Sequence, residues 1–246
     1  MRTPFWFLSK NPIALLLWPV LLFYYLGSKI VYMFKSIGAK SSRRPIVCIG
    51  NILAGGTGKT PIVMEIAKRY DAPVVLRGYK KSSETGDIGD EAKMMSDAGL
   101  AVHTGDRKSN IAILNKQKSD NIIVMDDGFQ NPKIKKDISV LVFDSGVGFG
   151  NGFMLPAGPL REPKRAIKRA DAVLIIRGAK QNPKFKIPYD VPVFYADTKN
   201  INPYNANDKI IAFAGIGYPQ KFFAAFKTIK NKKFPDHHQY TEQDIK

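Results

Sequence analysis

The run Gly-Gly-Thr-Gly-Lys-Thr at residues 55–60 has the composition of a loop that binds phosphate. Glycines let the backbone curl so that several N–H groups face one anion. The Lys59 ammonium would reach the terminal phosphates of a nucleotide, and the Thr60 hydroxyl would bind Mg²⁺. ATP and Mg²⁺ are therefore the predicted cofactors. The residues predicted to contact the nucleotide are Leu53, Ala54, Gly55, Gly56, Thr57, Gly58, Lys59 and Thr60.

The neighbouring sequence supports this interpretation. The run follows an apolar stretch at residues 45–49 and leads into helix-like sequence at residues 60–70. A helix that starts at the loop would add the positive end of its dipole to the anion site. One position departs from the usual pattern, which opens with Gly five residues before Gly58, where this chain has Leu53. The alternative is an ordinary glycine turn before a helix.

A pair of acids, Asp126 and Asp127, ends the apolar strand predicted at residues 121–125. A phosphate loop needs a carboxylate that holds or orients the Mg²⁺ shell, and this pair supplies one. The alternative is a turn-forming aspartate, which the pattern alone favours equally. The predicted metal ligands are Thr60, Asp126 and Asp127.

Phosphoryl transfer to an alcohol also needs a group that takes the hydroxyl proton. The candidates are Asp90, Glu91, Asp127, Asp144 and a histidine. Of the three histidines, His103 is expected to be structural or on the surface. His237 and His238 are adjacent, so their side chains point to different sides and at most one would serve a site. Arg77 and Arg161 lie in glycine-containing loops and would hold an anionic substrate group, or else are solvated surface residues.

Alternating strand and helix patterns follow the loop. Strands are predicted at residues 45–49, 72–76, 100–103, 121–125, 138–143, 172–176 and 210–214, and helices at residues 60–70, 90–98, 108–116, 165–170 and 219–228. This alternation predicts an α/β fold of the P-loop NTPase type, with a mainly parallel sheet and helices on both faces. Ligands of such sheets gather at the carboxyl ends of the strands, where the loop, Arg77 and the acids fall.

The amino-terminal part of the chain indicates a membrane. Residues 1–64 contain no Asp or Glu, and residues 11–28 are uncharged and mostly apolar. Basic residues without acids follow, which predicts that the rest of the chain lies on the cytoplasmic side. We expect a membrane-associated helix, inserted or spanning, while a buried core helix and a cleaved signal peptide are the alternatives.

Composition sets wider limits. The 246 residues suffice for one large core or two small ones, and the net charge of +17 suits an anionic partner such as a phosphorylated substrate, a membrane or nucleic acid. The basic residues are scattered, which argues against nucleic acid. The single cysteine, Cys48, excludes an internal disulfide and is expected in the core.

Taken together, the motifs resemble the tetraacyldisaccharide 4'-kinase (lipid A 4'-kinase) family. The matching runs, in order, are GNILAGGTGKTP, LRGY, GDEA, MDDGFQN, FGNGFMLPAGPLREP, RADAV, AFAGIGYPQKFF and FPDHHQYT. The Leu53 departure is itself a feature of that family. The resemblance implies transfer of the ATP γ-phosphate to the 4'-hydroxyl of an acylated glucosamine disaccharide 1-phosphate in the bilayer, which forms lipid IVA in lipid A biosynthesis.

The resemblance also implies roles for particular residues. Asp90 would be the base on the sugar hydroxyl, and His237 would orient it. Lys59 and Asp127 would complete the catalytic set, and Arg77, Tyr79 and Arg161 would contact the substrate. The enzyme would lie at the inner membrane of a Gram-negative bacterium, with its catalytic part on the cytoplasmic face and no obligate protein partner or nucleic acid.

The predicted domains are a membrane-associated helix at residues 1–36, a P-loop kinase core at 37–178 and a second lobe at 179–246. The family continues well past the Asp-His-His motif, so the resemblance implies a short second lobe with an incomplete sheet. Two other functions stay open: a membrane-associated ATPase switch that acts through a protein partner, and a nucleic-acid-binding NTPase. The switch class has a signature Lys where this chain has Ala54.

Overall fold

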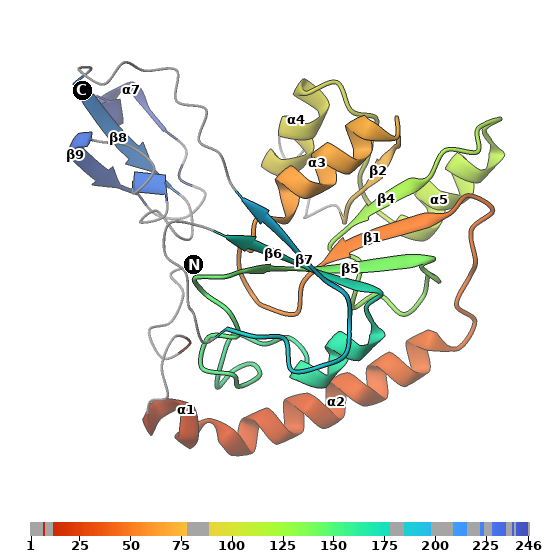
Figure 1. Cartoon of the computed structure of the whole chain (residues 1–246), viewed down its shortest axis with the longest axis horizontal. Helices are drawn as coiled ribbons and strands as arrows, with labels where there is room; N and C mark the ends of the chain where they lie inside the picture. The colour runs from red at the N-terminus through yellow and green to blue at the C-terminus, as the bar shows by residue number, and fades with distance from the viewer. Residues whose placement is uncertain are drawn as a thin grey trace.

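The apolar strands pair into one parallel sheet, with the strand that precedes the phosphate loop near its centre (Figure 1). The computed structural model describes residues 7, 12–77, 89–177, 185–197, 209–215, 222–223, 228–234, 238 and 240–245. The sheet order is β3-β2-β4-β1-β5-β6-β7, and all its pairings are parallel. The strands are β1 (Ile46–Gly50), β2 (Val74–Val75), β3 (Val102–His103), β4 (Ile123–Asp126), β5 (Ile138–Asp144), β6 (Ala172–Arg177) and β7 (Val193–Asp197).

Helices cover both faces of this sheet because its strands are apolar on both sides. Successive side chains of a strand point to opposite faces, so Cys48 belongs to one buried cluster and Ile49 to the other. The cluster with Ile49 is covered by α3 (Lys59–Arg69) and α4 (Asp90–Asp97). The cluster with Cys48 is covered by α5 (Arg107–Lys116) and the 3₁₀ helix η2 (Lys164–Arg169). The predicted fold class is confirmed.

The carboxyl-terminal edge of the sheet extends further than the sequence indicates. β7 pairs with β6 in register from Val173–Val193 to Arg177–Asp197. The strand falls after residue 179, where the sequence places the start of the second lobe, so residues 193–197 belong to the core sheet. The polar stretch before β7 hid this strand, because its exposed aromatic residues, Phe194 and Tyr195, do not form a buried apolar run.

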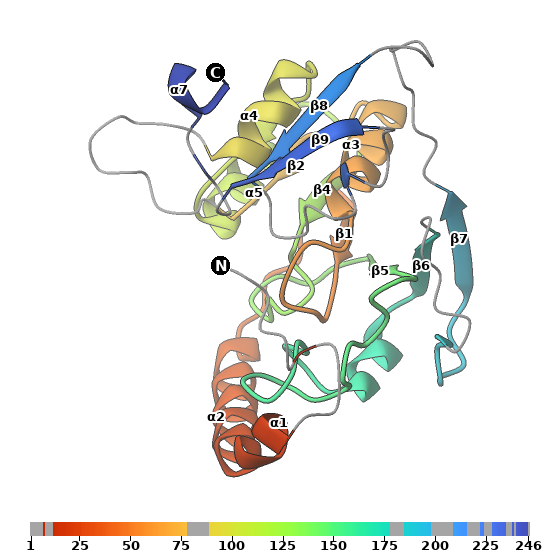
Figure 2. The same cartoon turned by 90° about the vertical axis from the view of Figure 1, so that its left-hand side faces the viewer.

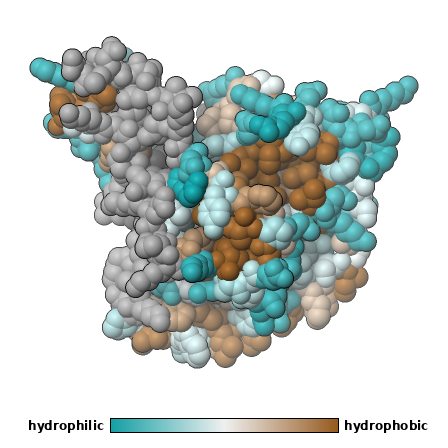
Figure 3. Space-filling view, viewed as in Figure 1, coloured by the Kyte–Doolittle hydropathy of each residue, from teal (hydrophilic) through white to brown (hydrophobic). Residues whose placement is uncertain are grey.

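The apolar amino-terminal segment forms α1 (Pro12–Leu16) and the long helix α2 (Trp18–Ser36), which runs along the lower side of the molecule in Figure 1. Leu21 and Tyr25 of α2 pack against the core, whereas Phe23 and Phe34 are 75% and 66% exposed. Figure 3 shows apolar residues interspersed with polar ones along this lower edge. Within the described part of the chain, no helix has the length and apolar character needed to cross a membrane.

A second, two-stranded parallel sheet joins β8 (Ile210–Ala214) and β9 (Thr228–Lys233), with α7 (Glu242–Ile245) nearby. Figures 1 and 2 place this sheet on the side of α3 and α4, away from α2. Of the helix predicted at residues 219–228, most lies outside the described residues, and Thr228 begins β9.

Candidate active site

The phosphate loop ends in a backbone conformation that glycine adopts easily. Gly58 has a φ of 80° and precedes the first helical residue of α3, Lys59. The positive φ favours glycine at this position, and a Cβ there would lie 2.8 Å from the Cδ1 atom of Ile176, so that side chain would have to shift. The loop thus connects the carboxyl end of β1 to the positive end of α3, where an anion is favoured.

Leu53 is explained by its packing. Its side chain is 2% exposed, and its backbone forms an isolated bridge with Leu160. On either side, the Ala54 N–H donates to the Pro159 oxygen and the Arg161 N–H donates to the Ile52 oxygen, each at 2.7 Å. The long loop at residues 145–163 is thus hydrogen-bonded to the phosphate loop. Only the backbone of Leu53 is left for the predicted nucleotide contact.

Asn51 and Gln130 brace the loop from inside. The buried Asn51 side chain donates to the Thr57 hydroxyl at 3.0 Å, which ties the start of the loop to its middle. The Gln130 side-chain amide donates to the backbone oxygen of Asn51 at 2.7 Å. These hydrogen bonds tie the loop to the end of β1 and to the segment that follows β4. Sequence reasoning did not single out either residue.

Asp127 is the charged centre of the site. It has a left-handed backbone, with φ 48°, so its carboxylate turns back toward the loop. One oxygen lies 3.5 Å from the Lys59 Nζ, and the other accepts a hydrogen bond from the Arg161 Nη1 at 2.9 Å. Burial alone would raise the pKa of Asp127, but the Lys59 and Arg161 charges outweigh it and hold this pKa below its ordinary value.

Asp126 has the opposite character. It is 4% exposed, and its Oδ1 has no hydrogen-bond partner among the described residues. Burial raises the pKa of Asp126 to about 6; the Lys59 charge opposes this shift, while the Glu91 and Asp127 charges add to it. The pKa values of the two adjacent carboxyls are therefore shifted in opposite directions, and of the two only Asp127 forms ion pairs among the described residues.

Arg107 is a residue of the site that sequence reasoning missed. It is 8% exposed, and its Nη2 donates to the backbone oxygens of both Asp126 and Asp127. These bonds hold the turn on which the two carboxyls stand. A signal was present in the sequence, because Arg107 occupies the first turn of α5, where the helix dipole disfavours a cation. The Asp106 carboxylate caps this helix by accepting from the Ser109 N–H at 2.9 Å.

Comparisons with known proteins indicate the family of this chain. A family model described as tetraacyldisaccharide-1-P 4'-kinase (LpxK) matches residues 13–246. The tetraacyldisaccharide 4'-kinase of Gluconobacter oxydans is 37% identical over an alignment 228 residues long, which covers 82% of this chain and 68% of that protein. The enzyme of the same name from Rickettsia rickettsii is 33% identical over an alignment 268 residues long, which covers 96% of this chain and 80% of that protein. The chain belongs to the tetraacyldisaccharide-1-P 4'-kinase family.

A solved structure has a fold similar to that of this chain. The "apo" form of LpxK from Aquifex aeolicus, in complex with ATP, has a TM-score of 0.72 and 24% identity, covering 94% of this chain and 84% of that one. The likeness concerns the fold.

Of the other predicted site residues, the structure describes Asp90 and Arg77 but not Tyr79 and His237. Asp90 is the exposed first residue of α4, and the charge of its neighbour Glu91 acts on Asp126, so the start of α4 lies near the acidic pair. Arg77 follows β2, and its charge acts on Arg107. Tyr79 and His237 lie outside the described residues, so their roles stay predictions.

Two further candidates for the base have structural partners. Asp144 accepts a hydrogen bond from the Gly146 N–H at 2.8 Å, which closes the turn after β5. His238 stacks on Phe234 with ring centroids 4.5 Å apart, and its Nε2 lies 3.0 Å from the Asp244 carboxylate. In the described ranges, no group of three or more His, Cys, Asp and Glu side chains lies close enough to hold a metal ion.

Proposed function

We propose that this chain transfers the γ-phosphate of ATP to the 4'-hydroxyl of a tetraacyldisaccharide 1-phosphate, a step in lipid A biosynthesis that forms lipid IVA. The observation that carries this proposal is the contact of Lys59 and Arg161 with one carboxylate, Asp127, beside the phosphate loop. Two cations and a helix amino end suit the terminal phosphates of a nucleotide. Family membership supplies the substrate class.

Lys59 would change partners when ATP binds, whereas Arg161 would stay with Asp127. In the structure both cations are held by Asp127. The terminal phosphates carry more negative charge than one carboxylate and would draw the Lys59 ammonium toward the loop. Asp127 keeps Arg161 close, so the cations remain aligned on the transferring group. The backbone bonds of Arg107 prevent the carboxylates from following the cation.

Magnesium fits the residues on this edge of the sheet. The free buried oxygen of Asp126 lacks a cation, and carboxylate and hydroxyl oxygens are the ligands that Mg²⁺ prefers. Asp126, Asp127 and Thr60 would hold the ion. Bound there, Mg²⁺ would neutralise charge on the β- and γ-phosphates. Because burial holds a proton on Asp126 below pH 6, metal binding would displace that proton.

Asp90 remains the proposed base, with His237 as the group that orients it. Asp90 lies at the amino end of α4, a place where the helix dipole favours a carboxylate. The proximity of Glu91 to Asp126 supports a base near the phosphate end of the site. His237 would come from the second lobe, which we propose to follow the core that includes β7. Arg77 and Tyr79 are the proposed contacts to the substrate headgroup.

The membrane surface is the proposed location, on the cytoplasmic face of the inner membrane. A tetraacylated sugar stays in the bilayer, so its kinase must work at the surface. The exposed apolar side chains of α2 and the acid-free sequence of residues 1–64 support insertion of this helix and attraction to anionic lipid. Independence from nucleic acid and from an obligate protein partner remains a prediction.

The test is phosphate transfer from labelled ATP to a tetraacyldisaccharide 1-phosphate in mixed micelles. Lys59→Ala should lower the rate at least about 100-fold, because it removes an electrostatic contact to the transferring group. Asp90→Ala should lower kcat far more than it weakens ATP binding. Lys93→Ala, on the exposed side of α4, is the matched control and should keep the parental rate.

A bis-phosphorylated glycolipid is the expected product. ATP hydrolysis that needs an added protein, with no glycolipid product, would instead identify a partner-driven ATPase switch. Full turnover by Lys59→Ala would refute the assignment of the phosphate loop. Equal loss of kcat and ATP binding in Asp90→Ala would remove Asp90 from the role of base.

A further inference from the structure

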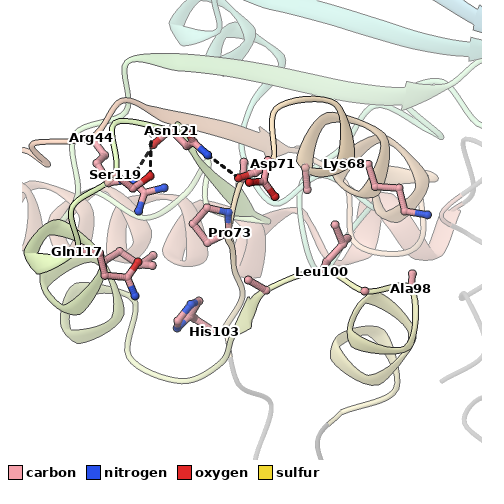
Figure 4. A pocket seen from close by; sticks show the side chains of 15 residues that line it. Arg44, Lys68, Asp71, Pro73, Ala98, Leu100, His103, Gln117, Ser119 and Asn121 are labelled. Atoms are coloured by element: carbon pink, nitrogen blue, oxygen red, sulfur yellow. Dashed lines mark hydrogen bonds between the residues drawn. The ribbon is translucent and has the colours of Figure 1, made fainter.

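A cavity of about 430 Å³ lies at the edge of the sheet opposite the active site. Its walls are the segments that lead into β2, β3 and β4, together with the ends of α3, α4 and α5. Figure 4 shows side chains from these segments around one open space. Lys59 begins α3 and Lys68 is near its end, which separates the two places by about 14 Å at 1.5 Å per residue.

Arg44 is the buried charge of this cavity. It is 2% exposed, and Figure 4 shows its side chain pointing between Gln117 and Pro73 into the lined space. Its Nε donates to the Asn121 oxygen at 2.6 Å and its Nη2 to the Ile122 oxygen at 3.3 Å. The Nη1 atom is buried and has no partner in the described part of the chain.

No carboxylate of the described residues forms an ion pair with Arg44. Burial lowers the pKa of Arg44, as does the neighbouring Arg43, while Asp120 opposes the shift. A buried guanidinium with a free N–H is costly, so native proteins usually give such a group a partner. Here the partner would come from the cavity.

The chemistry of the cavity wall favours an anion over a cation. Three helices end here, and free carbonyls would attract a cation, but backbone bonds already occupy the last turns. In α3 the Tyr70 N–H donates to the Ile66 oxygen at 3.1 Å, and in α4 the Gly99 N–H donates to the Ser96 oxygen at 2.9 Å. The donors of the wall that carry a full positive charge are Arg44 and the exposed Lys68.

Other polar groups of the wall are His103, Gln117, Ser119, Asn121 and Asp71. The Asp71 carboxylate is exposed at the rim and would repel an anion, so it lowers the affinity without blocking the site. The remaining lining is small and apolar and includes Ala72 and Leu100. It would accept the uncharged part of a small molecule.

We propose that this cavity binds a small molecule through an oxyanion group, phosphate or carboxylate. Arg44 contacts the oxyanion from the floor and Lys68 from the rim. The site is separate from the phosphate loop and does not depend on the proposed kinase reaction.

The test is ligand-observed NMR at constant ionic strength, with inorganic phosphate and acetate as separate probes. The protein carries Lys59→Ala, which weakens binding at the phosphate loop. Line broadening of each probe is titrated to give a Kd. Lys68→Gln should weaken binding about fivefold, because one of two cations is removed. Lys116→Gln, an exposed lysine of α5 outside the lining, is the matched control and should leave the Kd within about twofold.

Asp71→Asn makes the test independent of any loss of folding. Asp71 has φ 46°, a backbone conformation that Asn tolerates, and the change removes the only repelling charge among the lining residues that are described. Binding should therefore tighten about threefold. Stronger broadening of phosphate than acetate assigns a phosphate ligand, and the reverse assigns a carboxylate. Equal Kd values in Lys68→Gln, Asp71→Asn and Lys116→Gln would overturn the proposal.

Discussion

Replacing Asp126 by Asn should stabilise the fold at alkaline pH, although it removes a carboxylate that we propose as a ligand of Mg²⁺. The pKa of Asp126 rises from 3.8 to about 6, chiefly because the carboxyl is buried. One pKa unit corresponds to ~1.36 kcal/mol, so ionising Asp126 in the folded protein costs about 3 kcal/mol relative to the unfolded chain. Asn has no charge to bury and avoids this cost.

The pH dependence follows from the direction of the shift. A raised pKa means that the folded state binds the proton more tightly, so the contribution of Asp126 is favourable below pH 3.8 and is lost as the pH rises through about 6. Between pH 5 and pH 8 the loss is about 1.4 kcal/mol. Asp127 does not contribute in this window, because its pKa is lowered and it is ionised throughout.

Urea unfolding of the parent and of Asp126→Asn at pH 5 and pH 8, without Mg²⁺, measures this difference. We expect Asp126→Asn to be about 3 kcal/mol more stable at pH 8, with a smaller gain at pH 5. Asp120→Asn, whose side chain is 99% exposed, is the control and should follow the parent at both values. If Asp126→Asn and the parent lose the same stability between pH 5 and pH 8, the reasoning about burial is wrong.

Three further predictions follow from the packing. Leu53→Gly restores the usual residue of a phosphate loop. It should nevertheless lower the free energy of unfolding, measured in urea, by about 4 kcal/mol, because it removes a buried side chain and adds backbone freedom. An unchanged stability would contradict the role of the Leu160 contact. Arg107→Met should lower the free energy of unfolding by about 3 kcal/mol in the same assay, because two charge-assisted hydrogen bonds are lost. Arg107→Lys should recover part of this stability, and equal losses in the two variants would contradict the role of these bonds. Phe23→Asp should weaken binding to anionic vesicles about tenfold in a flotation assay and should change stability by less than about 0.5 kcal/mol. Ile113→Asp, at an exposed position of α5, should leave vesicle binding unchanged, and equal effects of the two would argue against α2 as the contact.

The sequence by itself determined the local features of this protein. The phosphate loop, the apolar strands and the helix after Gly58 are visible because each depends on residues close together in the chain, through glycine conformation and side-chain periodicity. For the same reason the acids at residues 126–127 could be placed at a strand end beside the loop. The family resemblance rested on such local runs, and the family comparison confirmed it.

Only the tertiary structure decided how these pieces act on one another. The pairing of Asp127 with Lys59 and Arg161, and the burial that leaves Asp126 without a cation, join segments far apart in the chain. The hydrogen bonds from Arg107 to the backbone of Asp126 and Asp127 also join distant segments. So does the backbone bridge between Leu53 and Leu160. Charge states and packing depend on distances across the fold, and a linear pattern of residue types does not contain those distances.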